Sequence, residues 1–347
     1  MLATIIGTTG STPAAALSKM LVRQGGIISV GTVGGGCMEG DVIRHAARLY
    51  DSGKAEIVSF ELSEDDIEHG LICGGGLDVL VEPITQEHIS LIRKLKLLRD
   101  QGEDCAVATF INKDGTVLLK EFLNSAPSGW EGTQAAALAQ QPEKPELLQT
   151  LIDSIAKVFR HQETVRLPIA EGTLILEPAP GTPSLVIFGG GHVSKYLSKI
   201  SSMAGFRVTI VDDREKFANE TRFPEASQTL AADFEQAFGK ISISGSTSLV
   251  IVTRGHRYDE LVLERALGTP ASYIGMIGSK RKVATAFAHL SEKGVPPEAL
   301  GRVHAPIGLD IGAVTAEEIA VSIVAELIHA RRDGGPVRHK SEELRNS

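Results

Sequence analysis

Three consecutive glycines stand between a predicted strand, Leu185–Phe188, and a predicted helix, Val193–Ala204. Glycines at this position permit a tight turn and let the backbone approach a pyrophosphate, while the helix N-terminus offers unpaired N–H groups and a partial positive charge. A second predicted strand, Arg207–Val211, leads into Asp212, where an acidic residue can bind ribose hydroxyls. This order of strand, glycine turn, helix, strand and acid predicts a Rossmann-type nucleotide-binding domain. Ser194 replaces the third glycine of the usual motif, and it is small enough for close packing of helix on strand.

The rest of the second half continues this alternation. We expect further strands at Leu249–Thr253 and Tyr273–Ile277, and helices at Leu261–Leu267, Arg281–Leu290 and Glu317–Arg331. Alternating strands and helices of this kind predict a doubly wound parallel sheet with right-handed crossovers. A cluster of prolines between residues 178 and 183 marks the boundary, so we expect one domain over residues 1–180 and the Rossmann-type domain over residues 181–347.

Polar side chains follow the predicted strands of this second domain, at the edge where open α/β sheets bind ligands. Ser279 and Lys280 open a helix, which suits an anion. The predicted cofactor-binding residues of this half are Gly189, Gly191, His192, Asp212, Arg214, His256, Ser279 and Lys280. Two alternatives remain open. The domain could be a scaffold or bind another phosphate ligand, and Lys280 to Lys282 could be a solvated helix start. His304 is more typical of a loop histidine, and we predict no catalytic residue.

The first half shows strand and helix periodicity in short apolar segments. We expect strands at Leu2–Ile6, Lys19–Val22, Gly26–Val30, Ile57–Leu62, Leu77–Val81 and Cys105–Ile111, and helices at Glu39–Tyr50 and Ile89–Leu98. Leu174–Pro178 resembles Val79–Pro83, which indicates one mixed sheet that continues to about residue 180. Residues 124–148 are rich in small and polar residues and are expected to form an exposed loop or insertion. The predicted fold class is α/β, with this mixed-sheet domain preceding the Rossmann-type domain.

Two cysteines lie beside glycine runs. Cys37 follows Gly35 and Gly36 at the start of a predicted helix, and Cys73 precedes Gly74. A thiol at a helix N-terminus has a lowered pKa and can act as a nucleophile or as a ligand for a soft metal. The spacing matches no zinc pattern, and the alternative is two small buried cysteines in tight turns. From this mirrored setting we predict that Cys37 and Cys73 are functional, that Gly35, Gly36 and Gly74 leave room for a ligand beside them, and that the mid-strand Cys105 belongs to the core.

Composition limits the classes of function. The formal net charge of −8 argues against a general binder of nucleic acid or of membrane surfaces, because both need basic patches. Three cysteines are too few for a disulfide scaffold, and no signal peptide or membrane-spanning run is evident. These features favour a cytoplasmic protein.

The chain resembles the XdhC/CoxI family of accessory proteins for molybdenum hydroxylases such as xanthine dehydrogenase. The resemblance runs through ordered motifs in both halves. These motifs are residues 10–13 (Gly-Ser-Thr-Pro), 31–39 (around Cys37), 73–75 (Cys-Gly-Gly), 189–193 (Gly-Gly-Gly-His-Val), 212–214 (Asp-Asp-Arg), 273–280 (Tyr-Ile-Gly-Met-Ile-Gly-Ser-Lys), 305–313 and 318–323.

The resemblance implies a role that composition and spacing alone do not. It implies a protein that binds the molybdenum cofactor (molybdopterin), supports its sulfuration by a cysteine desulfurase, and inserts it into a molybdenum hydroxylase apoenzyme without turnover of its own. Together with the mirrored setting, the resemblance implies that Cys37 and Cys73 face one another as ligands of this soft, sulfur-rich metal centre. The glycine runs, including Gly35, Gly36 and Gly74, suit the phosphate or nucleotide end of the cofactor. NAD or another nucleotide is a further candidate ligand of the Rossmann domain, and we expect a homodimer.

The sequence also departs from the family pattern. Ala14 to Ala16 follow Pro13, where relatives usually carry a basic residue, and the chain begins at its first strand without the leading helix of relatives, so a shortened N-terminus or a different start site is open. The alternative functions are an NAD-dependent oxidoreductase, which the Rossmann domain would suit, and a structural regulator of a partner enzyme. Against the oxidoreductase, the first half shows no coherent set of acid, base and substrate-binding groups.

Overall fold

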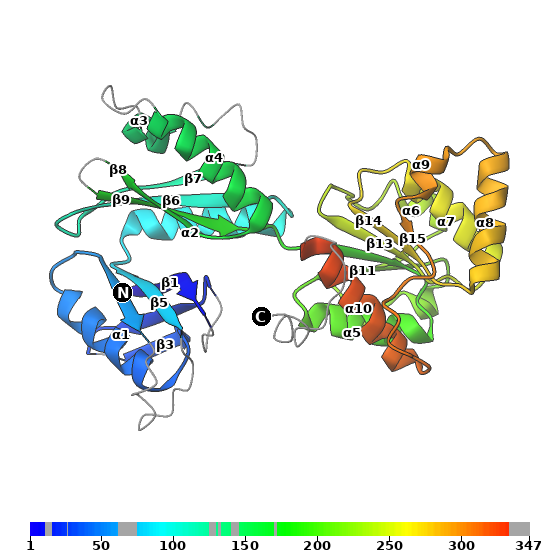
Figure 1. The fold of residues 1–347 in the computed structure, drawn as a ribbon. Helices are drawn as coiled ribbons and strands as arrows, with labels where there is room; N and C mark the ends of the chain where they lie inside the picture. Colours follow the sequence, from blue (N-terminus) through cyan, green and yellow to red (C-terminus); the bar gives the residue numbers. More distant parts are fainter. Residues whose placement is uncertain are drawn as a thin grey trace. The chain divides into compact units, whose positions relative to one another are not determined.

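The computed structural model describes residues 1–10, 16–25, 27–61, 75–124, 130, 133–139, 146–169 and 172–332 of the 347-residue chain. The chain divides into two compact units, Met1–Gly181 and Thr182–Ser347 (Figure 1). Among the helices described, none is both long enough and apolar enough to cross a membrane.

The first sheet of the N-terminal unit is antiparallel and has, among the described residues, the strand order β3-β2-β1-β5-β4. Its strands are β1 (Leu2–Thr9), β2 (Lys19–Arg23), β3 (Ile27–Gly31), β4 (Glu56–Glu61) and β5 (Gly76–Glu82). Helix α1 (Gly36–Leu49) covers one face, where its Val42 and Ala46 pack on Ile5 and Val79. Strand side chains alternate between faces, so the opposite face is presented to a second sheet.

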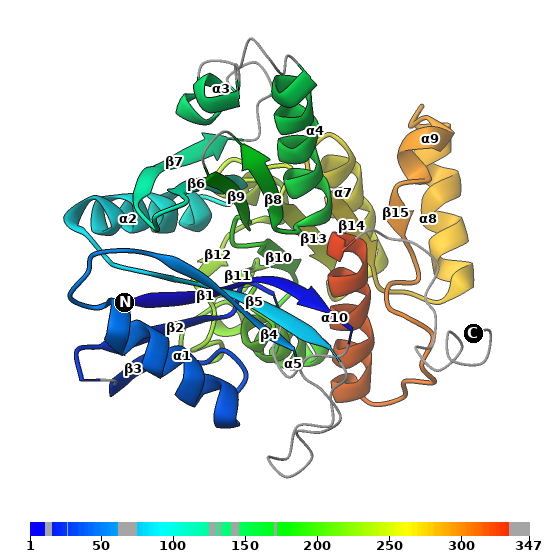
Figure 2. The same cartoon turned by 60° about the vertical axis from the view of Figure 1, so that its left-hand side comes forward.

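This second sheet is also antiparallel, in the order β7-β6-β9-β8. Its strands are β6 (Cys105–Asn112), β7 (Val117–Asn124), β8 (Val165–Ile169) and β9 (Gly172–Ala179). Its helices are α2 (Gln86–Asp100), α3 (Gln134–Ala139) and α4 (Glu146–His161). The apolar stripe of α4, formed by Leu151, Ile155 and Val158, is buried against the outer face of this sheet (Figure 2).

In the part of the chain that the structure describes, the two sheets pack on each other through a small apolar cluster and three ion pairs. Ile6 and Leu80 of the first sheet meet Ile111 and Ile175 of the second. Two glutamates of this interface are buried, and each binds a lysine from the opposite sheet: Glu82 with Lys120 at 2.6 Å, and Glu177 with Lys19 at 2.7 Å. The third pair joins Arg166 to Asp78 at 2.8 Å. Buried carboxylates need such partners, since an unpaired buried charge is strongly destabilising.

The prediction of one continued mixed sheet is therefore corrected to two antiparallel sheets. The two similar segments that suggested it are both central strands, β5 in the first sheet and β9 in the second. Both segments are apolar and end in a glutamate, Glu82 in β5 and Glu177 in β9, each of which pairs with a lysine. Alternation shows which side chains share a face of a strand, but it does not show which strand lies beside it.

Residues 124–148 differ from the expected exposed loop at several of the described positions. The Trp130 side chain is 5% exposed, stacks on Phe159 with ring centroids 6.0 Å apart, and donates from Nε1 to the Asn124 carbonyl oxygen at 2.7 Å. Ala135 and Ala136 of α3 are buried in the same core. One tryptophan side chain buries a large apolar area. Alanines give little hydrophobic periodicity in a sequence, so the pattern did not indicate that this segment packs on the core.

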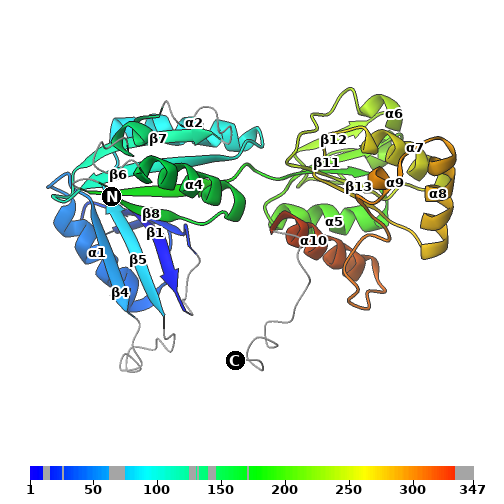
Figure 3. The same ribbon diagram turned by 45° about the horizontal axis from the view of Figure 1, so that its top comes forward.

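The C-terminal unit confirms the predicted doubly wound parallel sheet (Figures 1 and 3). Its strand order, among the described residues, is β12-β11-β10-β13-β14-β15, and every pairing is parallel. The strands are β10 (Ser184–Phe188), β11 (Arg207–Asp212), β12 (Gln228–Ala231), β13 (Thr247–Ile251), β14 (Tyr273–Met276) and β15 (Val303–His304). The short strands β12 and β15 had no periodic signal strong enough to predict.

Helices cover both faces of this sheet. They are α5 (His192–Met203), η3 (Glu215–Phe217), α6 (Phe234–Ala237), α7 (His256–Leu267), α8 (Lys280–Glu292), α9 (Pro297–Leu300) and α10 (Ala316–Arg332). The core on one face includes Leu197 of α5 and Ile323 of α10, and the core on the other includes Val262 of α7 and Val283 of α8. The C-terminal ends of the strands meet at one edge of the sheet, where the glycine run follows β10.

Candidate functional site

The first two glycines of the run are required by close backbone packing. Gly189 has φ of 108°, in the left-handed region that favours glycine, and its N–H donates to the Val211 carbonyl oxygen at 2.7 Å. A Cβ at Gly189 would lie 2.3 Å from the Val252 carbonyl oxygen, and a Cβ at Gly190 would lie 2.0 Å from that of Phe217. Any side chain at either position would overlap the backbone of a neighbouring segment, so both glycines are structural.

Gly191 is different, because nothing in the fold requires a glycine there. It is the N-cap of α5, has φ of −73°, and makes no side-chain cap to the helix. A Cβ at Gly191 would meet no atom within 4 Å. The position therefore combines free space with the N-terminal N–H groups of a helix, which is what the approach of an anionic ligand needs.

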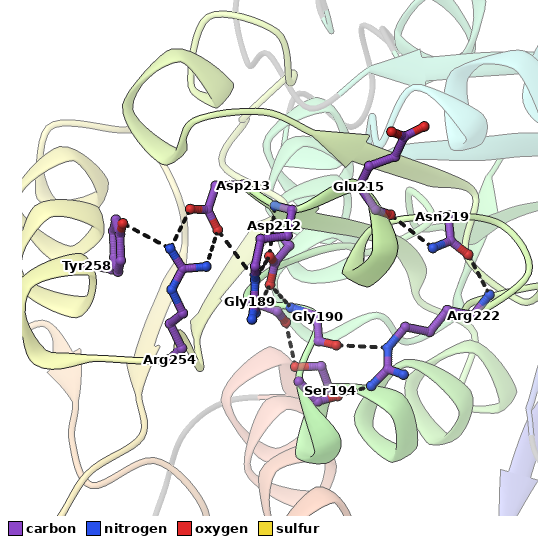
Figure 4. A network of polar contacts seen from close by, with 12 residues as sticks. Gly189, Gly190, Ser194, Asp212, Asp213, Glu215, Asn219, Arg222, Arg254 and Tyr258 are labelled. Carbon is purple, nitrogen blue, oxygen red and sulfur yellow. Dashed lines mark hydrogen bonds and ion pairs between the residues drawn. The ribbon is translucent and has the colours of Figure 1, made fainter.

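Ser194 fulfils the packing role that the motif assigns to a third glycine. Its side chain is fully buried, and its hydroxyl donates to the Gly189 carbonyl oxygen at 2.5 Å (Figure 4). The serine thus joins the first turn of α5 to the glycine loop, as its small size predicted.

Asp212 lies at the end of β11 with 1% of its surface exposed, and its carboxylate is fully engaged by the protein. Oδ2 accepts from the Gly190 N–H at 2.8 Å and from Arg214 Nη2 at 3.1 Å. Oδ1 accepts from the Arg214 N–H at 3.0 Å and from Arg214 Nε at 2.9 Å. Burial alone would raise the pKa of this carboxyl, but the hydrogen bonds from Arg214 and Gly190 outweigh it, and the pKa lies below its ordinary value.

This geometry bears on the role predicted for Asp212. To accept from ribose hydroxyls, the carboxylate would have to give up bonds to Arg214 or to the glycine loop. The Gly190 N–H, which would otherwise be available to a pyrophosphate, donates to Asp212 instead. Arg214, predicted as a cofactor-binding residue, is the main partner of Asp212. The carboxylate thus stabilises the loop from within.

An unpredicted arginine lies on the other side of the loop. Arg222 Nε donates to the Gly190 carbonyl oxygen at 3.0 Å and Nη2 donates to that of Gly191 at 3.2 Å (Figure 4). The guanidinium groups of Arg214 and Arg222 lie 3.7 and 5.2 Å from the centroid of the Phe217 ring. Arg222 follows the motif by about thirty positions, without any local pattern that could have indicated it.

An ion pair spans the strands on either side of β10. Arg254, which follows β13, donates from Nη1 and Nη2 to the two oxygens of Asp213 at 2.8 and 2.7 Å, and Nη2 also donates to the Tyr258 hydroxyl at 3.0 Å (Figure 4). Asp213 follows β11. The pair therefore joins the ends of β11 and β13 at the edge of the sheet that carries the glycine loop, and it raises the pKa of Arg254 further.

The remaining predicted cofactor-binding residues of this unit do not all lie at the glycine loop. His192 is exposed and lies edge-on to the Tyr196 ring, with centroids 5.4 Å apart. His256 and Ser279 line a separate pocket between α7 and α8, whereas Lys280 is exposed and is not part of its wall. Lys282, on the same helix, lines that pocket.

The predicted residues of the N-terminal unit are only partly described. Gly35 and Gly36 open α1 with φ of 76° and 61°, and a Cβ on either would meet no atom within 4 Å. The Gly35 N–H donates to Glu39 Oε1 at 3.1 Å. The side chain of Cys37, and Cys73 and Gly74 entirely, lie outside the described residues. Cys105 is buried, donates from Sγ to the Ala179 carbonyl oxygen at 3.3 Å, and has its pKa raised by burial to about 11, as a core thiol should.

The described part of the chain was compared with the side-chain groupings that hold metal ions in proteins. It holds no group of three or more histidine, cysteine, aspartate or glutamate side chains arranged to hold a metal ion.

Two family models match the chain. The model of the XdhC Rossmann domain matches residues 185–327, and the model of the XdhC and CoxI family matches residues 1–61. The chain belongs to the XdhC and CoxI family. The resemblance seen in the sequence is thereby confirmed, and membership makes the chain a xanthine dehydrogenase accessory protein.

Individual relatives agree with this family. The chain is 28% identical over 337 residues to a Bacillus subtilis (strain 168) protein described as a probable subunit of xanthine dehydrogenase, covering 96% of this chain and 93% of that relative. It is 32% identical over 152 residues to the uncharacterized protein YqeB of Escherichia coli (strain K12), covering 44% of this chain and 28% of YqeB. A crystal structure of a xanthine dehydrogenase from Bacillus halodurans matches with a TM-score of 0.72 at 24% identity, covering 99% and 94% of the two chains. This likeness concerns the fold.

Proposed function

We propose that this member of the XdhC and CoxI family binds the molybdenum cofactor, supports its sulfuration by a cysteine desulfurase, and delivers it to a xanthine dehydrogenase-type apoenzyme. We propose that it does so in the cytoplasm as a homodimer. The relative from Bacillus subtilis, named for xanthine dehydrogenase and similar along almost the whole chain, supports this class of partner.

The observation that carries the proposal is the free space at Gly191. The molybdenum cofactor is a phosphorylated pterin, so its phosphate end needs N–H donors and room beside the backbone. Gly191 supplies the room, the uncapped N-terminus of α5 supplies the donors, and Arg222 adds positive charge at the same loop. Cys37 and Cys73 of the N-terminal unit are proposed, separately from this loop, as ligands of the metal. When bound, the cofactor would bring the molybdenum and sulfur chemistry, and the protein's groups would position and shield it.

The same loop fits an ordinary NAD site less well. That site needs a free carboxylate at the end of the second strand for the ribose, and here both oxygens of Asp212 bind Arg214 and the glycine loop. The geometry therefore favours the accessory role over an NAD-dependent oxidoreductase.

Gly191→Val is expected to reduce the molybdenum and pterin content of protein purified without oxygen to background. The branched side chain would occupy the space beside the backbone, while the protein should lose only about 1 kcal/mol through a poorer N-cap residue. Gly245→Val is the control, since Gly245 also has no atom within 4 Å of a Cβ but precedes β13 at the opposite edge of the sheet. Wild-type cofactor content in Gly191→Val, or none in the wild type, would contradict the assignment.

Cys37→Ser and Cys73→Ser are each expected to fold normally and to lose most bound molybdenum. Serine keeps nearly the same size but removes the soft ligand that the metal prefers. Cys105→Ser is the matched control, because that thiol is buried in the core with its pKa raised. Metal analysis and thermal unfolding of the three variants separate a loss of ligand from a loss of stability. Full metal retention in both Cys37→Ser and Cys73→Ser would refute the role of these thiols.

A further inference from the structure

A pocket of about 570 Å³ opens between α7 and α8 of the C-terminal unit. Both helices begin at the C-terminal edge of the parallel sheet, after β13 and β14 respectively, and lie side by side (Figures 1 and 3). The volume is within the range of small-molecule sites, which is about 300–1,000 Å³. Among the described residues, none of the glycine loop, Asp212 or Arg222 lines this pocket, so it is distinct from the site at Gly191.

The floor of the pocket is a buried carboxylate held in a fixed position. Asp259 is 1% exposed, and its Oδ1 accepts from the Thr253 hydroxyl at 2.6 Å and from the Thr253 N–H at 3.2 Å. Its Oδ2 accepts from Lys282 Nζ. Lys282 reaches it past Gly278, where a Cβ would lie 3.0 Å from Lys282 Cδ. The glycine before α8 therefore makes room for the lysine, and the pair neutralises the floor.

The walls carry excess positive charge. Arg257 of α7 and Arg281 of α8 both line the pocket. Within the part of the chain that the structure describes, neither guanidinium is paired with an acidic side chain, whereas Glu260 of the same wall pairs with His289 at 3.0 Å. Three basic side chains against two acidic ones leave one positive charge, with the histidines neutral. The N-termini of α7 and α8 each add about half a charge more.

From this cavity and its charge we propose a second ligand site, between α7 and α8, for a small molecule that carries a phosphate monoester. A surplus of about two positive charges matches a dianion, and arginine forks and helix N-termini are the groups that bind phosphate oxygens. Thr285 and Ser279 supply hydroxyls, and the buried side chains of Met276 and Ala286 form the apolar backing of the pocket. This site does not depend on the proposed role in cofactor delivery.

The test is a titration of the full chain with glycerol 2-phosphate. Binding is measured by calorimetry and by the change in the imidazole NMR signals of His256 and His289. We expect saturable binding that shifts both signals. Arg257→Gln and Arg281→Gln should each weaken it roughly tenfold, as expected for the loss of one charged hydrogen bond. Lys280→Gln is the matched control, because Lys280 adjoins Arg281 but does not line the pocket, and it should change affinity less than about twofold.

Other anions identify which group is recognised. Sulfate should bind more weakly than the phosphate ester, and acetate should not shift the histidine signals. Gly191→Val should bind the phosphate ester like the wild type, and Arg281→Gln should retain molybdenum and pterin, so failure here is distinguishable from failure of the proposed function. The site is refuted if neither histidine signal moves with the phosphate ester, or if Lys280→Gln weakens binding as much as Arg281→Gln.

Discussion

Gly190→Ala is expected to destabilise the C-terminal unit by about 3 kcal/mol, whereas Gly191→Ala should leave its fold intact. A Cβ at Gly190 would lie 2.0 Å from the Phe217 carbonyl oxygen, and a Cβ at Gly191 would meet no atom within 4 Å. The clash is with backbone, so it cannot be relieved by rotating a side chain. Moving the Gly190 backbone to relieve the clash would disturb the hydrogen bond from its N–H to Asp212.

Urea unfolding with hydrogen exchange of β10 and β11 measures this contrast. The two variants add the same methyl group at adjacent positions, and the poorer N-cap of α5 in Gly191→Ala acts against the expected difference. The loss in Gly190→Ala should be concentrated in the C-terminal unit, because the affected contacts all lie there. Equal stability of the two variants would show that the loop does not pack closely against Phe217.

Asp212→Ala should cost a comparable amount, about 3 kcal/mol. The change removes the acceptor of four hydrogen bonds and leaves the Gly190 N–H and the Arg214 guanidinium without their partner. Asp213→Ala is the matched control. That neighbouring carboxylate pairs with Arg254 at the surface, with side chains 21% and 38% exposed, and such pairs contribute less than about 1 kcal/mol.

The contribution of Asp212 should also depend on pH in a defined direction. Its pKa is lower in the folded protein than the value of about 3.9 expected for an unfolded chain. A lowered pKa means that the stabilisation is complete above about pH 4 and is lost as the pH falls through the folded pKa. Urea midpoints of the wild type and Asp212→Asn should therefore differ most near neutral pH and converge in acid. A difference that grows in acid would contradict the direction of the shift.

Local order along the chain was enough to predict the C-terminal fold. The strand before Gly189, the helix after Gly191 and the acid after β11 are adjacent in sequence, and each has its own periodic or conformational signal. Parallel strands joined by helices need right-handed crossovers, so the alternation of elements predicts a doubly wound parallel sheet. The order of its strands, and the short strands β12 and β15, were not predicted. The family resemblance rests on the same adjacent motifs and was confirmed for the same reason.

The N-terminal unit shows where such reasoning ends. The strands β5 and β9 were both predicted, yet the sequence did not reveal that they are centres of two separate sheets. Their partners, β1 with β4 and β6 with β8, lie at varied distances along the chain. Antiparallel pairing depends on long-range contacts between faces, and alternation within one strand carries no information about its neighbour.

The roles of individual side chains were likewise decided by tertiary structure. The sequence determined that Gly189, Gly191 and Asp212 lie at the same edge of the sheet, because the glycines follow β10 and Asp212 ends the adjacent parallel strand β11. Only the folded chain shows that Asp212 turns inward to Gly190, that Arg222 returns to the loop, and that Lys282 rather than Lys280 enters the pocket. The physical reason is that side-chain orientation follows from the space and the charges around each residue, and these come from segments distant in the sequence, such as Phe217 beside Gly190 and Asp259 beside Lys282.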